Sequence, residues 1–180
     1  RSTVPGANDN LTGVATILGV ARRLREEPVE GLRVLLVSTG SEESFMEGMQ
    51  AFARRHFGEL PTDRTHVICV DTVGSPQLIQ LEGEGMLRMR EYPESFKALL
   101  SQVADDEGIQ LARGMRLRNA TDGLVALKRG YPTVMLGSAN RYKVPSNYHW
   151  PTDTPENVVY GTVVDAIRVC EGVVRRLAAD

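Results

Sequence analysis

Five acidic or imidazole side chains stand in four short segments, each at a turn or directly after an apolar run. The segments are residues 6–10 (GANDN), 41–44 (SEES), 70–72 (VDT) and 147–150 (NYHW), and they supply Asp9, Glu42, Glu43, Asp71 and His149. Zinc is bound in enzymes by carboxylate oxygens and imidazole nitrogens, and a catalytic site keeps one position open for water. In a pair of adjacent glutamates, one can bind metal while the other acts as a base. The set therefore predicts hydrolytic zinc chemistry.

Each of these side chains also has a structural interpretation when it is taken alone. Asp9 stands in a Gly/Asn turn, where an acid is typical of turns and caps. The two glutamates could simply favour the dipole of a following helix, and a histidine beside aromatic residues is often structural. Asp71 is harder to explain in this way, because a carboxylate that ends an apolar strand is costly to bury unless it is paired or binds metal.

Alternating helix and strand patterns connect the four segments. Helices are predicted over residues 11–25, 45–56, 93–106, 123–129 and 157–178, with Asn10 and Ser44 as possible caps of the first two. Buried strands are predicted over residues 32–38, 66–73 and 132–137, and a strand nearer the edge over 77–82. This alternation predicts an α/β domain with helices on both faces of a mostly parallel sheet. Since ligands bind beyond the carboxyl ends of such strands, the acidic segments and His149 are expected to meet at one edge.

Composition excludes several classes of partner. The chain has 180 residues, 42% of them hydrophobic, and a net charge of −2, so no general attraction to nucleic acid is expected. No apolar run approaches the ~18 residues of a membrane span, and the first ten residues do not resemble a signal peptide. Cys69 and Cys170 stand in apolar surroundings and are expected to be reduced core residues.

Taken together and in order, the segments resemble the co-catalytic zinc exopeptidases of metallopeptidase family 28. That family includes bacterial di-zinc aminopeptidases and glutamate carboxypeptidase, and glutaminyl cyclase is among its relatives. The similar segments are GANDNLTGVA (6–15), GSEES (40–44), ICVDTVGSP (68–76), ATDGLVALKRGYPTVML (120–136) and NYHWPTDTPENV (147–158). The resemblance implies a three-layer α/β/α fold with a mostly parallel mixed sheet, of the zinc exopeptidase (phosphorylase/hydrolase-like) type, in a single domain over residues 1–180.

The resemblance also implies a set of metal ligands. Asp9 would bridge two metals, Glu43 and His149 would complete one zinc site, and Asp71 would bind the other zinc. The family completes that second site with a histidine from an upstream His-x-Asp segment, and this chain has no histidine before Asp9. We therefore expect one complete zinc site here and a second that needs a ligand from outside the chain. The family's first strands are expected to lie in a preceding part of the same protein that packs against this one, or to be absent.

Four further residues receive roles from the same resemblance. Glu42 would be the general base, and Tyr148 would steady the oxyanion. Asp122 would be a buried acid near the substrate, although an N-cap for the following helix is an equal alternative. Arg118 could face the substrate, although a solvated strand face is the ordinary role of such a residue.

The function implied is zinc-dependent hydrolysis of N-terminal peptide bonds, with a peptide or small amide as substrate. Two alternatives remain open. A single-zinc site beside Asp122 resembles the arrangement of glutaminyl cyclase, which an assay of N-terminal glutamine cyclisation would distinguish from hydrolysis. Some domains of this fold serve as inactive receptors or scaffolds, but retention of Glu42, Glu43, Tyr148 and His149 argues against that role. Family members are often exported, and the sequence of this chain assigns it to no particular cellular compartment.

Overall fold

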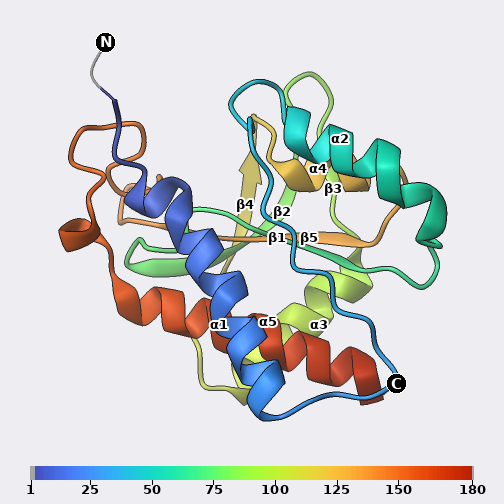
Figure 1. Cartoon of the computed structure of the whole chain (residues 1–180). Helices are drawn as coiled ribbons and strands as arrows, with labels where there is room; N and C mark the ends of the chain where they lie inside the picture. The colour runs from blue at the N-terminus through green and yellow to red at the C-terminus, as the bar shows by residue number, and fades with distance from the viewer. Residues whose placement is uncertain (1–2, 180) are drawn as a thin grey trace.

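A computed structural model describes residues 3–179, and its centre is one mixed sheet of five strands (Figure 1). The strands are β1 (Val67–Val70), β2 (Gln77–Glu84), β3 (Arg90–Glu91), β4 (Ala112–Leu117) and β5 (Thr133–Ala139). β1 runs parallel to β5, and β4 runs parallel to β2. β2 runs antiparallel to both β5 and β3. The long β2 and β5 thus form the middle of the sheet, and they carry most of its buried residues.

Helices cover both faces of the sheet, as predicted (Figure 1). One layer holds α1 (Thr12–Glu26), α3 (Glu94–Asp106) and α5 (Tyr160–Ala179), and the other holds α2 (Glu47–His56) and α4 (Asp122–Leu127). Short helical turns stand at η1 (Ala7–Leu11), η2 (Phe57–Glu59) and η3 (Pro155–Asn157). The expected three-layer α/β fold is therefore confirmed. Between residues 3 and 179, no helix combines the length and apolar content that a membrane span requires.

The alternation of side chains along β5 divides the core between the two layers. Val134 and Leu136, both fully buried, pack toward α3 and α5, where Leu100 and Val169 are equally enclosed. Met135, on the opposite face, belongs to a second cluster with residues of β2. Because every residue of β5 is buried, the apolar run 132–137 reflects a strand enclosed on both faces.

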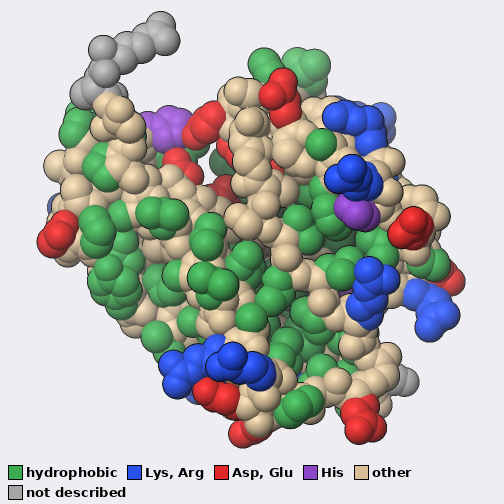
Figure 2. Space-filling view, viewed as in Figure 1, with side chains coloured by type: hydrophobic (Ala, Val, Ile, Leu, Met, Phe, Trp, Pro, Cys, Tyr) green, Lys and Arg blue, Asp and Glu red, His purple; other side chains and the backbone are tan. Residues whose placement is uncertain are grey.

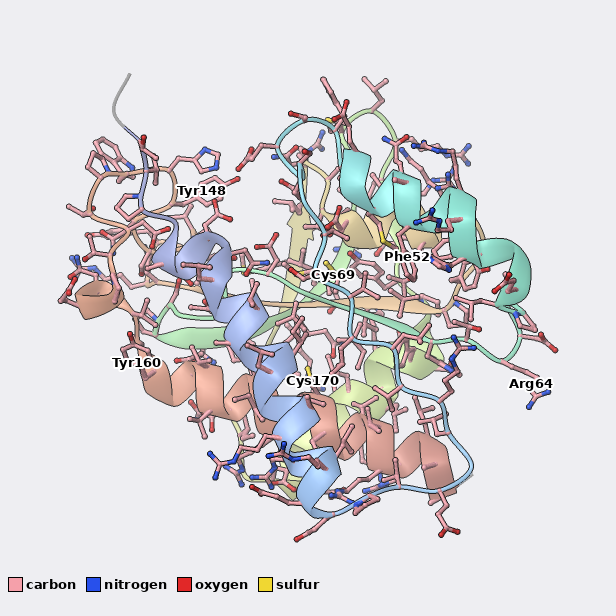
Figure 3. All side chains as sticks on the ribbon, viewed as in Figure 1. Phe52, Arg64, Cys69, Tyr148, Tyr160 and Cys170 are labelled. Atoms are coloured by element: carbon pink, nitrogen blue, oxygen red, sulfur yellow. The ribbon has the colours of Figure 1, made fainter. Side chains whose placement is uncertain are left out.

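The two cysteines lie in different parts of the core. Cys69 is on β1, and Cys170 is buried on α5 (Figure 3). Both are free thiols, as expected.

The prediction of a buried strand over residues 32–38 is wrong. No strand among residues 3–179 pairs with this segment, and Leu35, Leu36 and Val37 are 41%, 44% and 37% exposed. An apolar run can form a central strand only where neighbouring strands supply hydrogen bonds on both sides. The described chain supplies none here, so the segment remains outside the sheet.

Two further sequence predictions need correction. The strand over residues 77–82 is not near an edge, because β3 and β4 pair with β2 on the side away from β5. The second helix begins at Glu47 and not at Phe45, because Phe45 and Met46 adopt positive φ angles of 62° and 58°. No side chain forms a capping hydrogen bond there, so Ser44 is not a cap.

Candidate metal centre and active site

Three loops that are far apart in sequence bring Asp9, Glu43 and His149 together. The Nε2 atom of His149 lies 2.5 Å from Glu43 Oε1 and 3.2 Å from Asp9 Oδ2. One ligand atom from each of the three residues lies within 4.8 Å of the other two. Figure 2 shows a hollow here, bordered by histidine and acidic side chains. Two carboxylates and one imidazole that can converge on one point are a donor set that fits a zinc ion.

A network of polar contacts holds the loop that carries Asp9. Asn8 accepts the Gly74 N–H at 2.7 Å and donates from its side chain to Ser75 Oγ at 3.2 Å. Asn10 Oδ1 accepts the N–H groups of Thr72 and Gly13 at 3.1 and 3.0 Å. The N-cap position of α1 is Leu11 and not Asn10 as predicted, but the Asn10 side chain still satisfies one N–H of the first turn. The loop is thereby tied to the end of β1, where Asp71 stands.

Gly13 makes the close approach between α1 and β1 possible. A Cβ atom at this position would lie 2.6 Å from the carbonyl oxygen of Val70, which is shorter than side chains tolerate. The glycine near the end of the GANDNLTG motif is therefore required by packing, because a larger residue would push the Asp9 loop away from β1.

Asp71 follows β1 and lies in the same pocket as Asp9. Its Oδ1 atom is buried and has no hydrogen-bond partner among residues 3–179. Burial, followed by repulsion from Asp9 and Glu42, raises the pKa of Asp71 to about 7. A buried carboxylate oxygen without a donor is costly in a finished fold, and a cation would satisfy it. This observation supports the predicted role of Asp71 near a metal.

Asp122 is the first residue of α4, and it also has a buried oxygen, Oδ1, without a hydrogen-bond partner in the described chain. Its other oxygen accepts a hydrogen bond from the Thr39 hydroxyl. The N-cap of α4 is Thr121, whose side chain accepts the Gly123 N–H at 3.2 Å. The alternative that Asp122 is only the cap is therefore wrong, and its carboxylate lies close enough to Asp71 and Glu42 to raise the pKa of both.

Glu42 and Tyr148 have the protonation properties that their predicted roles need. Burial, followed by repulsion from Glu43, Asp122 and Asp9, raises the pKa of Glu42 to about 7. A carboxyl with a pKa near the working pH can both accept and return a proton.

Burial and the same acidic surroundings raise the pKa of Tyr148, so its phenol keeps its proton and can donate a hydrogen bond. Its ring stacks on that of His149 with centroids 3.9 Å apart, on the loop above the start of α1 (Figure 3).

A pocket of about 320 Å³ adjoins the acidic cluster. Asp9, Glu42, Glu43, Asp71 and Tyr148 line one part of it. The other part is largely apolar and is formed by side chains from β2, β4, β5 and the loops around them, namely Phe45, Met46, Ile79, Leu81, Met86, Met115, Leu117, Met135 and Pro145. The pocket can thus hold a molecule with a charged or polar end and an apolar side chain.

The family model that describes peptidase family M28 matches residues 1–174. The chain belongs to peptidase family M28. This confirms the family that the sequence motifs indicated. No curated protein sequence matches the chain.

Solved structures of similar fold include several that are described as aminopeptidases, together with LapB and a glutaminyl cyclase. LapB from Legionella pneumophila has a TM-score of 0.86 and 13% identity over 100% of this chain and 49% of its own. The aminopeptidase from Aneurinibacillus sp. strain AM-1 has a TM-score of 0.77 and 22% identity, covering 96% of this chain and 40% of its own. A Bacteroides thetaiotaomicron glutaminyl cyclase bound to N-acetylhistamine has a TM-score of 0.71 and 19% identity, covering 96% of this chain and 63% of its own. The M28 chain therefore spans between 40% and 63% of the length of these three structures.

The structure does not bring Arg118 into the M28 pocket. Arg118 is exposed at the end of β4 and is absent from the pocket lining, whereas Arg116 and Asn119 contribute to it. Arg116 forms an ion pair with Glu91 at 2.8 Å on the sheet surface. The stretch that contains Arg118 thus forms a partly solvated strand, which agrees with the ordinary role considered for it.

Two buried acids near the site were missed by the sequence reasoning. Glu84 on β2 is fully buried and accepts hydrogen bonds from the Tyr92 hydroxyl at 2.5 Å and from the Thr121 N–H at 2.6 Å. It thereby fixes the start of α4 beside Asp122. Asp153 is 1% exposed and contacts the Asp9 loop. Glu84 gave no signal because it ends an ordinary alternating strand, whereas Asp153 is the acid of the Tyr-His-x-x-x-Asp-Thr pattern and received no role.

Unusual backbone conformations gather around the M28 site. Several non-glycine residues near it have positive φ angles between 50° and 62°, namely Ser41, Phe45, Met46, Thr72, Asn147 and His149. Such conformations are uncommon for residues with a Cβ atom and cluster at functional sites. They belong to three loops. The first carries Glu42 and Glu43, the second carries Asp71, and the third carries Tyr148 and His149, so the conformation of the backbone contributes to the direction of these side chains.

Proposed function

We propose that this M28 chain carries the catalytic centre of a zinc-dependent aminopeptidase. The observation that carries the proposal is the convergence of Asp9, Glu43 and His149 beside Glu42, whose pKa is near neutral. Asp9, Glu43 and His149 would hold one zinc ion, and the unpaired oxygen of Asp71 would turn toward a second. When bound, zinc supplies a Lewis acid and lowers the pKa of water toward about 7.

Glu42 and Tyr148 then have different roles in the proposed reaction. Glu42 takes a proton from the attacking water and passes it to the amine that leaves when the peptide bond breaks. Tyr148 keeps its proton and donates a hydrogen bond to the oxygen that gains negative charge, a contribution worth about 3 kcal/mol for a well-placed donor. The acids of the pocket attract the positive α-amine of a peptide, and the apolar part of the pocket receives its first side chain.

The aminopeptidase assignment also agrees with the solved structures of similar fold, several of which are described as aminopeptidases. An exposed scaffold surface would have no need of a half-buried carboxylate with a pKa of about 7 beside three potential ligands. The inactive receptor or scaffold function is therefore the weaker candidate.

Glu42→Gln tests the proposal, because it removes the base but keeps the shape of the side chain. We expect the variant to bind as much zinc as the wild type and to lose peptide hydrolysis by at least about 10²-fold. Glu47→Gln is the matched control, since Glu47 is exposed at the start of α2, and it should hydrolyse peptides like the wild type. An active Glu42→Gln would remove Glu42 as the base.

Glutaminyl cyclisation is the second candidate, and one observation favours it. Asp122 keeps a buried, unpaired carboxyl oxygen and lies close enough to Glu42 to raise its pKa, beside the one set of three ligands found among residues 3–179. One structure of similar fold is described as a glutaminyl cyclase. Assays of one peptide with N-terminal glutamine and one with N-terminal leucine separate the two functions. Release of free amino acids supports the aminopeptidase, and loss of ammonia from the glutamine peptide alone supports the cyclase.

A further inference from the structure

Asp153 connects the loop that carries His149 to the loop that carries Asp9. Its Oδ1 atom accepts the Asn8 N–H at 2.7 Å, and its Oδ2 atom accepts the Asp9 N–H at 3.1 Å. Its backbone carbonyl accepts the Ala7 N–H at 3.1 Å. Its own N–H donates to the Trp150 carbonyl at 3.0 Å, so the residue is also fixed to the turn that follows His149.

We propose that Asp153 is the positioning residue that sets the distance between Asp9 and His149. Three successive N–H groups of the Asp9 loop end on this one residue, four positions after His149 in the chain. Asp153 is 1% exposed, so water does not compete for these hydrogen bonds. The contact of 3.2 Å between His149 Nε2 and Asp9 Oδ2 is built on this connection.

A carboxylate is the side chain that this position requires. Both of its oxygens accept hydrogen bonds, and both face backbone donors here. Hydrogen bonds to a charged acceptor are roughly twice as strong as neutral ones. Asparagine has the same shape but only one accepting oxygen, so its NH₂ group would face the N–H of Asn8 or Asp9. Asp153→Asn therefore removes one hydrogen bond and places donor against donor, directly behind Asp9.

The inference rests on the proposed zinc site, and the experiment separates the two. Zinc binding is measured by calorimetry on the purified metal-free chain, for the wild type, Asp153→Asn and the matched control Asp63→Asn, which changes an exposed aspartate in a surface turn. We expect the zinc dissociation constant to rise about 10- to 100-fold in Asp153→Asn, the usual effect of losing a residue that orients a ligand. The control should bind zinc like the wild type.

Two further readouts distinguish positioning from general stability. The visible spectrum of the Co²⁺-loaded chain should change in Asp153→Asn, because the ligands are held differently. For peptide hydrolysis, kcat should fall while KM stays within about 2-fold, because the pocket that binds the peptide is unchanged. Lower stability of the metal-free variant, with unchanged zinc affinity and an unchanged Co²⁺ spectrum, would show a structural role only and would overturn the inference.

The outcomes for the wild type and the variants distinguish the inference from the proposed function. If the wild type binds no zinc, the proposed function fails and the inference, which rests on it, is overturned with it. If the wild type binds zinc and Asp153→Asn binds it equally well, the function stands and the inference is overturned. If Asp153→Asn does not fold, Asp153→Ser replaces it, because a hydroxyl can accept one N–H without presenting a fixed donor. Wild-type zinc affinity in the Ser variant would overturn the inference as well.

Discussion

Asp71 gives the sharpest prediction for the metal-free chain. Folding raises the pKa of its carboxyl from 3.8 to about 7, mainly through burial and then through repulsion from Asp9 and Glu42. A carboxyl whose pKa is raised by folding destabilises the folded state once the pH exceeds the pKa in the unfolded chain. This cost begins near pH 4 and is complete above about pH 7. Asp71→Asn, which removes the charge, should therefore stabilise the metal-free chain at neutral and alkaline pH.

The magnitude follows from the shift. About three pKa units correspond to about 4 kcal/mol when the carboxyl is ionised in both states, as at pH 8, and to about 1 kcal/mol at pH 4.5. The neighbouring carboxyls titrate together with Asp71 and relieve part of the repulsion. We therefore expect Asp71→Asn to raise the free energy of unfolding by about 2 to 4 kcal/mol at pH 8 and by no more than about 1 kcal/mol at pH 4.5.

Urea unfolding in the presence of a chelator measures this difference at pH 4.5, 6 and 8. Asp63→Asn is again the matched control, and its free energy of unfolding should follow that of the wild type at every pH. The decisive quantity is the change of the Asp71→Asn effect with pH. A gain that is equally large at pH 4.5 and pH 8, or a loss of stability at pH 8, would refute the argument that the Asp71 carboxyl is held at an electrostatic cost.

Two other predictions concern the ligands and the phenol. His149→Ala removes one of three converging ligands, so elemental analysis should find about one zinc per wild-type chain and little in the variant. Added zinc should raise the melting temperature of the wild type alone. Equal zinc content in both proteins would exclude this cluster as the zinc site. Tyr148→Phe removes the phenol hydroxyl, which stays protonated and can donate a hydrogen bond. The kcat should therefore fall about 10²- to 10³-fold with zinc content unchanged. A kcat within about 3-fold of the wild type would exclude Tyr148 from oxyanion stabilisation.

The fold was predictable from the sequence where local patterns agreed with the tertiary surroundings. The run 132–137 became the fully buried β5, and the stripe of residues 93–106 became α3, with Pro93 directly before its first residue. The run 32–38 has the same apolar character and did not become a strand. Hydrophobicity shows that a segment tends to be buried, but pairing depends on a neighbouring strand that the segment itself does not encode.

The candidate site was predictable because its side chains follow strands or stand in turns of fixed composition. Asp9, Glu43 and His149 converge as expected, and Asp71 and Glu42 line the same pocket. The interactions of Asp153 and Glu84 were not predictable, because their partners are backbone N–H groups far away in sequence. Any residue can provide such a donor, so the sequence carries no mark of it. The cap of α4 is a local case, because Thr121, one residue before the predicted Asp122, accepts the N–H of nearby Gly123.

The site joins parts of the chain that are made at very different times. The contact between Asp153 and Asn8 spans 145 positions, and that between His149 and Glu43 spans 106. Closing such long loops is entropically costly and slow, and it follows the formation of local helices. During synthesis, the segment with Asp9 and Glu43 emerges long before the one with His149. Asp9 and Glu43 can therefore meet His149 only after most of the chain has been made, so the proposed zinc site is expected to form late in folding.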